Sequence, residues 1–340
     1  MPHTEKLLLD FRTHMQSSPL PTRHNLGVAD KTISGYMNDL SIFLRWWKQV
    51  HAAELDVEHL KNNPFLLNKK KLQDFLTWLE TERKYTASTI LRHAASLRSF
   101  SGYLLAIEAI QHDPTLGLRL PIKKQSDPKG LDDDQRAQFE FVFLSPWLDK
   151  VTKRKRSRET LSPKRLARDK AIAFLMLYAG PRVEETYALN LGDIEIYPRS
   201  GMLHIRKGKN AKERDVPLPK PAREALTEWL KVRSEYSINH DALFVELRRG
   251  TFNRLSMRSM QTMVVEAGQR AGLDRIEPPV AVTPHILRHT YLYMLRKVGV
   301  SAEVRAEMAG HSLETTMKYG SPKLEEKQRA AELLDEAVTI

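Results

Sequence analysis

The sequence predicts a mainly α-helical protein of two domains, with one small β-sheet in the second domain. Its 340 residues exceed the usual length of a single domain, and 41% of them are hydrophobic, which is enough for packed cores. Apolar residues recur at helical spacing through most of the chain, whereas residues 201–219 contain short alternating runs typical of strands. A stretch with three prolines, residues 112–130, separates the two halves.

The first half contains three segments whose apolar residues fall on one face of a helix: residues 30–50, 68–83 and 86–107. These stripes predict the core of a helical domain that spans residues 1–120. Basic side chains on the other faces include Arg92, His93 and Arg98. They fit either a solvated surface or contacts with phosphate groups, and composition does not decide between the two.

A linker over residues 121–130 leads to a second domain, predicted to span residues 131–322. Its first helix covers residues 131–143, where Asp132 is a suitable N-cap and acidic residues fill the first turn. Residues 150–170 hold ten lysines or arginines against two acids, which fits either a solvated loop or phosphate contact. The candidate DNA contacts in this segment are Lys153, Arg154, Lys155 and Arg156.

The rest of the second domain is predicted to be helical around one β region. The predicted elements are helices over residues 167–180 and 182–191 and strands over residues 201–208 and 213–219. The pair Gly180-Pro181 separates the two helices, and the chain is mostly helical from Pro221 onward. Residues 323–340 carry an apolar stripe and predict a C-terminal helix, whose stripe must be buried against its own domain or another surface.

Composition restricts the classes of partner and chemistry. Lys plus Arg number 54 and Asp plus Glu 42, so the formal net charge is +12. This charge favours a protein that binds a polyanion such as nucleic acid; a basic soluble protein without such a partner is the alternative. The absence of cysteine excludes disulfides, thiolate nucleophiles and cysteine zinc sites. No apolar run is long enough for a signal peptide or a membrane span, so we expect a cytoplasmic protein without membrane contact.

One helical segment concentrates residues that handle protons and anions. In HILRH, His285, Arg288 and His289 share a helix face. Paired histidines at this spacing can bind zinc, but Ile286 stands where a metalloprotease has glutamate, and Arg288 would repel a cation. We therefore expect no metal; a packing role for the histidines is the plain alternative. Arginines that bind phosphate, together with histidine, lysine and tyrosine, can break a phosphodiester without a cofactor.

Four stretches of the sequence resemble the motifs of a family that carries out this chemistry. They are AGPRVEETYALNLGDI, GKNAKERDVPL, TPHILRHTYLYML and AGHSLETTMKYG. In order and spacing they resemble the mixed α+β catalytic domain of the tyrosine recombinases, the phage-integrase family that includes the Xer and Cre recombinases, across roughly residues 131–320. TASTILRHAASLRSF resembles, less specifically, the helical SAM-like core-binding domain of the family.

The resemblance implies roles for the reacting residues. Tyr319 matches the nucleophile, which attacks a DNA phosphate and leaves a 3′-phosphotyrosyl bond with a free 5′-hydroxyl. Arg182 and Arg288 match the arginines that bind the non-bridging oxygens and stabilise the negative charge of the transition state.

The proton-transfer residues follow from the same resemblance. Lys209 matches the β-turn lysine that protonates the departing 5′ oxygen; Lys207 and Lys212 are close rivals, but GKNAKER aligns without a gap on Lys209. His285 matches the residue that handles the tyrosine's proton. His311 matches the histidine-or-tryptophan position that holds the phosphate.

Two further residues match supporting positions of the family's site, and the sequence differs from the family's usual pattern at two places. Glu185 matches an acidic supporting residue and His289 a supporting histidine, and for both a structural role is an equal alternative. Tyr319 lies eight residues after His311, where the family more often shows nine, so the delivery of the tyrosine is expected to differ. Pro181, in AGPR where TGLR is usual, should stiffen the approach to the following arginine.

The predicted function is site-specific DNA recombination through a 3′-phosphotyrosyl intermediate and a Holliday junction, without a cofactor. The implied partners are double-stranded DNA with paired half-sites and three further copies of the chain, which form a tetramer linked through the C-terminal helix. Two rivals stay open: a type IB topoisomerase-like enzyme that rejoins the same strand, and a DNA-binding protein without catalysis. The sequence does not separate integration, transposition, inversion and dimer resolution.

Overall fold

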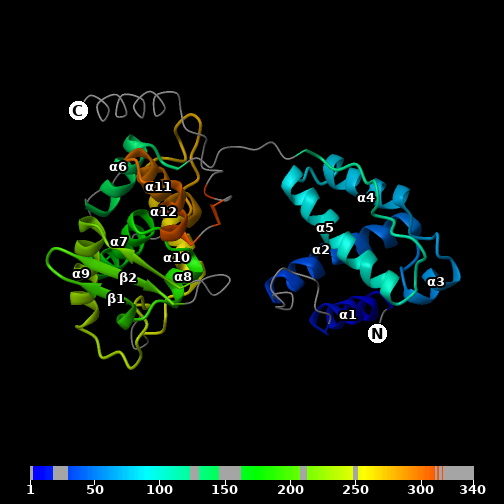
Figure 1. The fold of residues 1–340 in the computed structure, drawn as a ribbon, viewed down its shortest axis with the longest axis horizontal. Helices are drawn as coiled ribbons and strands as arrows, with labels where there is room; N and C mark the ends of the chain where they lie inside the picture. Colours follow the sequence, from blue (N-terminus) through cyan, green and yellow to red (C-terminus); the bar gives the residue numbers. More distant parts are fainter. Residues whose placement is uncertain are drawn as a thin grey trace, which may run out of the picture. The chain divides into compact units, whose positions relative to one another are not determined.

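The computed structural model describes residues 3–17, 30–122, 130–144, 162–206, 213–247, 252–310, 312–313 and 316. The chain divides into two compact units, Met1–Gln125 and Ser126–Ile340, and each is described by itself (Figure 1). The predicted fold class, mainly α with a small β-sheet, is confirmed. Among the described residues, we find no helix with the length and apolar character that crossing a membrane requires.

The N-terminal unit packs its helices around one apolar core (Figure 1). Its described helices are α1 (His3–Ser17), α2 (Asp30–His51), α3 (Val57–Asn62), α4 (Lys69–Thr81) and α5 (Ala87–Ala106). Buried aromatic rings join them: Phe11 packs edge to face on Phe100, and Phe43 on Phe75. The three predicted helices are confirmed as α2, α4 and α5. Helices α1 and α3 were not singled out from the sequence.

His93 corrects the interpretation of α5. The sequence pattern places it on an outer face, but the residue is only 1% exposed. Its ring stacks on Tyr85, and its Nε2 lies 3.6 Å from a carboxylate oxygen of the buried Asp39. Burial lowers the pKa of His93, which favours the neutral ring. Arg92 and Arg98 are exposed as predicted, and Arg92 Nη2 lies 2.9 Å from Asp39 Oδ1.

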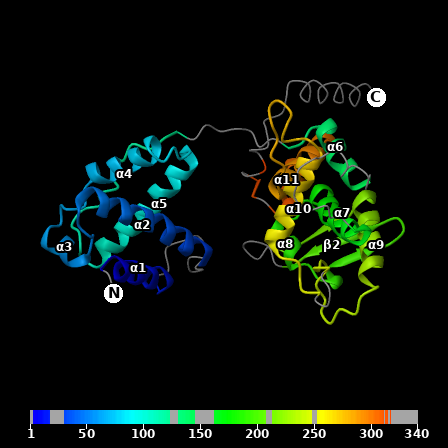
Figure 2. The ribbon, with the colours of Figure 1, turned by 180° about the vertical axis from the view of Figure 1, so that it is seen from behind.

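The second unit is built around one buried helix. Its described helices are α6 (Asp133–Leu144), α7 (Pro163–Tyr178), α8 (Val183–Ala188), α9 (Lys220–Arg233), α10 (Met257–Arg270), α11 (Pro284–Lys297) and α12 (Ala302–Ala309). The apolar run 171–177 is buried on every side within α7, as a helix that is hydrophobic all round must be. Helices α6, α9, α10 and α11 pack against α7. Helices α8 and α10 lie side by side in both views (Figures 1 and 2).

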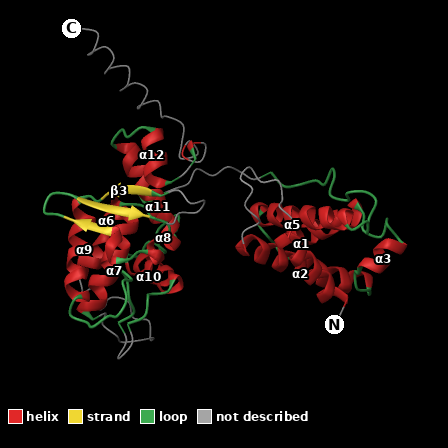
Figure 3. Ribbon diagram, turned by 60° about the horizontal axis from the view of Figure 1, so that its bottom comes forward, coloured by secondary structure: helices red, strands yellow, loops and turns green. Residues whose placement is uncertain are grey.

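A three-stranded antiparallel sheet covers one side of this unit (Figure 3). Its strands are β1 (Ile194–Ile196), β2 (Gly201–Ile205) and β3 (Arg214–Pro217), in that order. Leu203 pairs with Val216, and both side chains are buried. The predicted strand pair is confirmed as β2 and β3. Strand β1, three residues long, was not predicted. Strand β3 packs beside α12.

Local signals set several helix starts correctly and one incorrectly. Asp132 caps α6 as predicted: its Oδ1 accepts the Gln135 N–H at 2.9 Å, and Gln135 Oε1 accepts the Asp132 N–H at 3.2 Å. The helix expected from residue 167 instead begins at Pro163, because Ser162 caps it and proline suits the first helical position.

The end of the basic segment is therefore helical rather than a solvated loop. Arg168, counted in that segment, is buried; its guanidinium donates to Asp169 Oδ1 and to the Val245 carbonyl. Lys153, Arg154, Lys155 and Arg156 lie outside the described residues. The helix expected over residues 182–191 ends earlier, at Ala188, and a 3₁₀ turn over Leu191–Asp193 follows it.

Candidate active site

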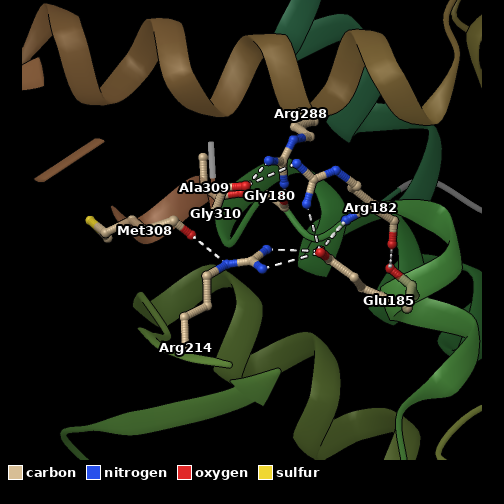
Figure 4. Close-up of polar contacts among 9 residues, drawn as sticks. Gly180, Arg182, Glu185, Arg214, Arg288, Met308, Ala309 and Gly310 are labelled. Atoms are coloured by element: carbon tan, nitrogen blue, oxygen red, sulfur yellow. Dashed lines mark hydrogen bonds and ion pairs between the residues drawn. The ribbon is translucent and has the colours of Figure 1, made fainter. Parts of the chain in front are cut away.

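Three arginines from separate parts of the second unit meet at one place (Figure 4). Arg182 immediately precedes α8, Arg214 begins β3, and Arg288 lies in α11. Glu185, in the first turn of α8, lies between two of them, and the end of α12 lies against all three. Two of these arginines and the glutamate were predicted from the sequence.

Arg182 is held by its own helix. Gly180 takes a left-handed backbone with φ of +64°, Pro181 follows, and Arg182 is the extended N-cap residue of α8. Its backbone N–H donates to Glu185 Oε2 at 2.7 Å, and its Nη1 donates to Oε1 at 2.8 Å. The side chain keeps 25% of its surface exposed, so this guanidinium is accessible to a phosphate.

Glu185 is a buried, charged carboxylate. Arg214 donates Nη1 to its Oε1 at 3.1 Å and Nη2 to its Oε2 at 2.8 Å, a bidentate pair. Burial by itself would raise the pKa of Glu185, but the hydrogen bonds and charges of Arg214 and then Arg182 outweigh it and hold the pKa at about 2. The carboxylate is therefore ionised at neutral pH and binds both arginines.

Arg288 is buried, with 1% of its surface exposed. Its Nη1 donates to the carbonyl of Gly180 and its Nη2 to the carbonyl of Ala309. Each Nη carries two hydrogens, so one bond to a carbonyl does not exhaust its capacity to donate. Arg288 thus ties the turn before Arg182 to the end of α12.

The end of α12 offers three successive carbonyl groups to the three arginines (Figure 4). Met308 O accepts from Arg214 Nε at 3.0 Å, Ala309 O accepts from Arg288, and Gly310 O accepts from Arg182 Nη2 at 3.0 Å. The carbonyl end of a helix carries partial negative charge, which suits cations there. Gly310 ends the helix in the left-handed conformation, with φ of +60°.

His285 and His289 form a pair beside this cluster. Their ring centroids lie 4.2 Å apart at an interplanar angle of 72°. His285 keeps part of its surface exposed, but desolvation by the surrounding protein, followed by the charges of Arg288 and Arg182, lowers its pKa. Burial, followed by His285 and Arg288, lowers the pKa of the buried His289 to about 4. Both rings are therefore mainly neutral at pH 7, and a neutral imidazole can accept a proton.

The sequence-predicted residues divide into two groups. The structure brings Arg182, Glu185, His285, Arg288 and His289 together. The other predicted catalytic residues, Lys209, His311 and Tyr319, lie outside the described part of the chain, as do the rival lysines Lys207 and Lys212.

Arg214 was missed by sequence reasoning. The signal that could have found it is strand alternation, because Arg214 shares a face of β3 with the buried Val216. A charged residue on the inward face of a strand needs a buried partner, and Glu185 is that partner.

Gly180 allows a direct test of how tightly this cluster is built. A Cβ at this position would lie 2.2 Å from Cδ1 of Tyr291, and the backbone is left-handed. Gly180→Ala should lower the free energy of unfolding by about 3 kcal/mol or more, from backbone strain and overpacking. Urea unfolding measures this. In Gly192→Ala, where the added Cβ meets nothing within 4 Å, the midpoint should hardly move; equal losses would contradict the described packing.

Comparison with known proteins shows to which family the chain belongs. Residues 154–326 match the Phage integrase family, and residues 20–110 match the Phage integrase, N-terminal SAM-like domain. The chain belongs to the phage-integrase family of tyrosine recombinases. It is therefore a DNA strand-transferase enzyme, and the SAM-like assignment of the first domain is confirmed.

Individual relatives and a solved structure are consistent with this family membership. The chain is 27% identical over 315 residues to tyrosine recombinase XerC of Pseudomonas syringae pv. tomato, covering 90% of each chain. It is 30% identical over 297 residues to XerC of Corynebacterium efficiens, covering 86% of this chain and 82% of the relative. The crystal structure of XerH site-specific recombinase bound to palindromic difH substrate superposes with a TM-score of 0.67 at 19% identity, covering 98% and 94% of the chains, and so shares the fold. These relatives support site-specific recombination and do not favour the topoisomerase-like alternative.

Proposed function

We propose that this protein is a site-specific recombinase that cleaves and rejoins DNA through a 3′-phosphotyrosyl bond formed by Tyr319. The observation that carries the proposal is the cluster of Arg182 and Arg288 beside a neutral His285, within a domain of the phage-integrase family. Two guanidinium groups suit the non-bridging oxygens of one phosphate, because each can donate two hydrogen bonds and stays charged.

The proposed reaction has two matched steps. The Tyr319 hydroxyl oxygen attacks phosphorus, the bond from phosphorus to the 5′ oxygen breaks, and His285 accepts the tyrosine's proton. Lys209 gives a proton to the departing 5′ oxygen, and His311 helps to hold the phosphate. A 5′-hydroxyl of the partner strand then attacks the phosphotyrosine and releases the tyrosine. The ester conserves the bond energy, so the exchange needs no cofactor.

Arg182 and Arg288 stabilise the charge that develops on the phosphate oxygens. Glu185 supports Arg182 through two hydrogen bonds, and the end of α12 supports both arginines through carbonyl groups. Such fixed donors need little reorganisation when the charge develops. His289 packs on His285 and orients its ring.

We propose double-stranded DNA with paired half-sites as the substrate, in the cytoplasm, and a tetramer of this chain that passes through a Holliday junction. The formal charge of +12 suits a polyanion, and the XerH structure contains a palindromic substrate. The exposed Arg92 and Arg98 of α5 would contact DNA phosphates from the N-terminal unit. The stretch Lys153–Arg156 would add contacts from the second unit.

The proposal is tested with the full chain and sheared DNA of the source genome. Protein recovered with DNA after denaturation reports a covalent bond, and sequencing the attached DNA reports the site. A Holliday junction built from that site should then be resolved into recombinant duplexes. Relaxation of supercoiled DNA without resolution would identify a topoisomerase-like enzyme, and binding without covalent attachment would identify an inactive DNA-binding protein.

The assignment of Lys209 as general acid gives a second prediction. A good leaving group does not need protonation, so a substrate with sulfur at the 5′-bridging position should restore cleavage to Lys209→Ala. Cleavage rates on the sulfur and oxygen substrates measure the rescue. Lys207→Ala and Lys212→Ala are the matched controls, and rescue of one of these in place of Lys209→Ala would transfer the role to it.

The C-terminal segment gives a third prediction. Residues 323–340 lie outside the described residues, and we propose that they form a helix that docks on a neighbouring subunit. Truncation after Pro322 should leave binding to one site and cleavage of a nicked substrate largely intact, while recombination fails. Gel-shift stoichiometry beside recombination yield measures both. A truncated protein that forms tetrameric complexes and recombines would contradict the proposed exchange.

A further inference from the structure

We propose that Arg214 is a positioning residue for strand cleavage, because it joins Glu185, and through it Arg182, to the end of α12. The inference rests on the proposed function. It adds a residue to which the sequence comparison gave no role, and its effect is on the alignment of the arginines with the end of α12.

The contacts of Arg214 use every nitrogen of its guanidinium. Nη1 and Nη2 donate to the two carboxylate oxygens of Glu185 at 3.1 and 2.8 Å, and Nε donates to Met308 O at 3.0 Å. The side chain is 6% exposed, and all three guanidinium nitrogens donate to protein groups. Arg214 therefore acts through its neighbours.

These contacts form a closed ring of hydrogen bonds that passes through Arg214, Glu185, Arg182 and the end of α12 (Figure 4). Arg214 binds Glu185, Glu185 binds Arg182, Arg182 binds Gly310 O, and the chain from Gly310 back to Met308 returns to Arg214. A shift of α12 would lengthen the bonds to both arginines at once. The ring thus fixes the position of the C-terminal end of α12 relative to Arg182 and Arg214.

Gly310 shows that the ring is closely packed. A Cβ there would lie 2.7 Å from Arg214 Nη1 and 3.0 Å from its Cζ, and the backbone is left-handed. The guanidinium of Arg214 and the turn after α12 are thus in direct contact. Arg214 also pairs in the sheet with Ile205, so the same residue anchors the last strand of the β2–β3 hairpin.

Lysine should replace Arg214 only in part. An ammonium is a compact charge that lacks the planar fork, so it cannot reproduce a bidentate pair with a carboxylate together with a third bond to Met308 O. Without Arg214, burial would act on the Glu185 carboxyl against Arg182 alone, and its pKa would rise from about 2. At low pH the protonated carboxyl would then hold Arg182 less firmly.

The test compares Arg214→Met and Arg214→Lys with a matched control, Arg206→Met. Arg206 lies just after β2, is 65% exposed, and forms an ion pair with Asp193 at 2.6 Å, so the control removes the same charge and an ion pair from the same sheet. The measurements are the affinity for duplex DNA and the single-turnover rate of adduct formation on saturating nicked DNA, with folding followed by thermal unfolding.

We expect Arg214→Met to slow adduct formation by about tenfold to a hundredfold, the effect of a small misplacement of reacting groups. DNA affinity should stay near that of the wild type. The adduct rate of Arg214→Lys should lie between those of the wild type and Arg214→Met, and Arg206→Met should cleave at the wild-type rate. The rate loss in the double variant Arg182→Ala with Arg214→Met should be smaller than the product of the two single losses, because both residues belong to one bonded network.

Three results would overturn the positioning role. These are wild-type adduct rates in both folded Arg214 variants, a loss of DNA affinity equal to the loss of rate, and multiplicative rate losses in the double variant. If Arg214→Met does not fold, the lysine variant decides by the same criteria. A wild-type protein that forms no adduct on any DNA would overturn the proposed function and this inference together, whereas an active wild type with unaffected Arg214 variants would overturn the inference alone.

Discussion

Replacement of Tyr319 by phenylalanine should abolish covalent attachment to DNA and leave DNA affinity unchanged. The substitution removes only the hydroxyl oxygen that would attack phosphorus and keeps the ring. An adduct that survives denaturation should form with the wild type and be absent from Tyr319→Phe on the same nicked substrate. Gel shift under native conditions should show equal binding by both proteins.

Two nearby tyrosines serve as controls. Tyr291 is buried, with its ring against Gly180, and burial raises its pKa to about 12, so its hydroxyl stays protonated. Tyr293, two residues on, is exposed on α11. Tyr291→Phe and Tyr293→Phe should both form the adduct. If Tyr319→Phe formed it and one of these variants did not, the nucleophile would be the control residue.

Features of this fold that depend on neighbours in the sequence could be predicted. The apolar stripes of α2, α4 and α5 and the capping of α6 by Asp132 are local patterns, and each was found at nearly the correct position. The same holds for the β2–β3 pair, since alternation and a turn specify a hairpin. The proximity of Arg182 and Glu185 is also local, because one helical turn separates them.

Features that depend on packing between distant segments could not be predicted. Arg214 has a partner 29 residues earlier in Glu185 and another 94 residues later in Met308, and no spacing in the sequence relates them. His93 looked like a surface residue because its type is polar, yet it faces a buried carboxylate on α2. The groups that lie opposite a buried charged or polar side chain are known only from the fold.

Replacement of Arg288 by alanine should lower the rate of DNA cleavage by about 10²–10³-fold, as expected when a positioned charged donor to a transition state is lost. The carbonyls of Gly180 and Ala309 would also lose a buried donor, so unfolding should cost about 1–3 kcal/mol less. Single-turnover cleavage at saturating DNA, corrected for the folded fraction from urea unfolding, separates the two effects.

The matched control for this loss is Arg168→Ala. Arg168 is another buried arginine, bound to Asp169 and to the Val245 carbonyl. Its removal should destabilise the same unit by a similar amount and leave the corrected cleavage rate at the wild-type value. Arg288→Ala should differ from it in rate while both bind DNA with near wild-type affinity. A parallel fall of affinity and cleavage in Arg288→Ala would make Arg288 an ordinary phosphate anchor. Equal corrected rates in the two variants would make it a structural residue, because its bonds to Gly180 and Ala309 would then account for all of its effect.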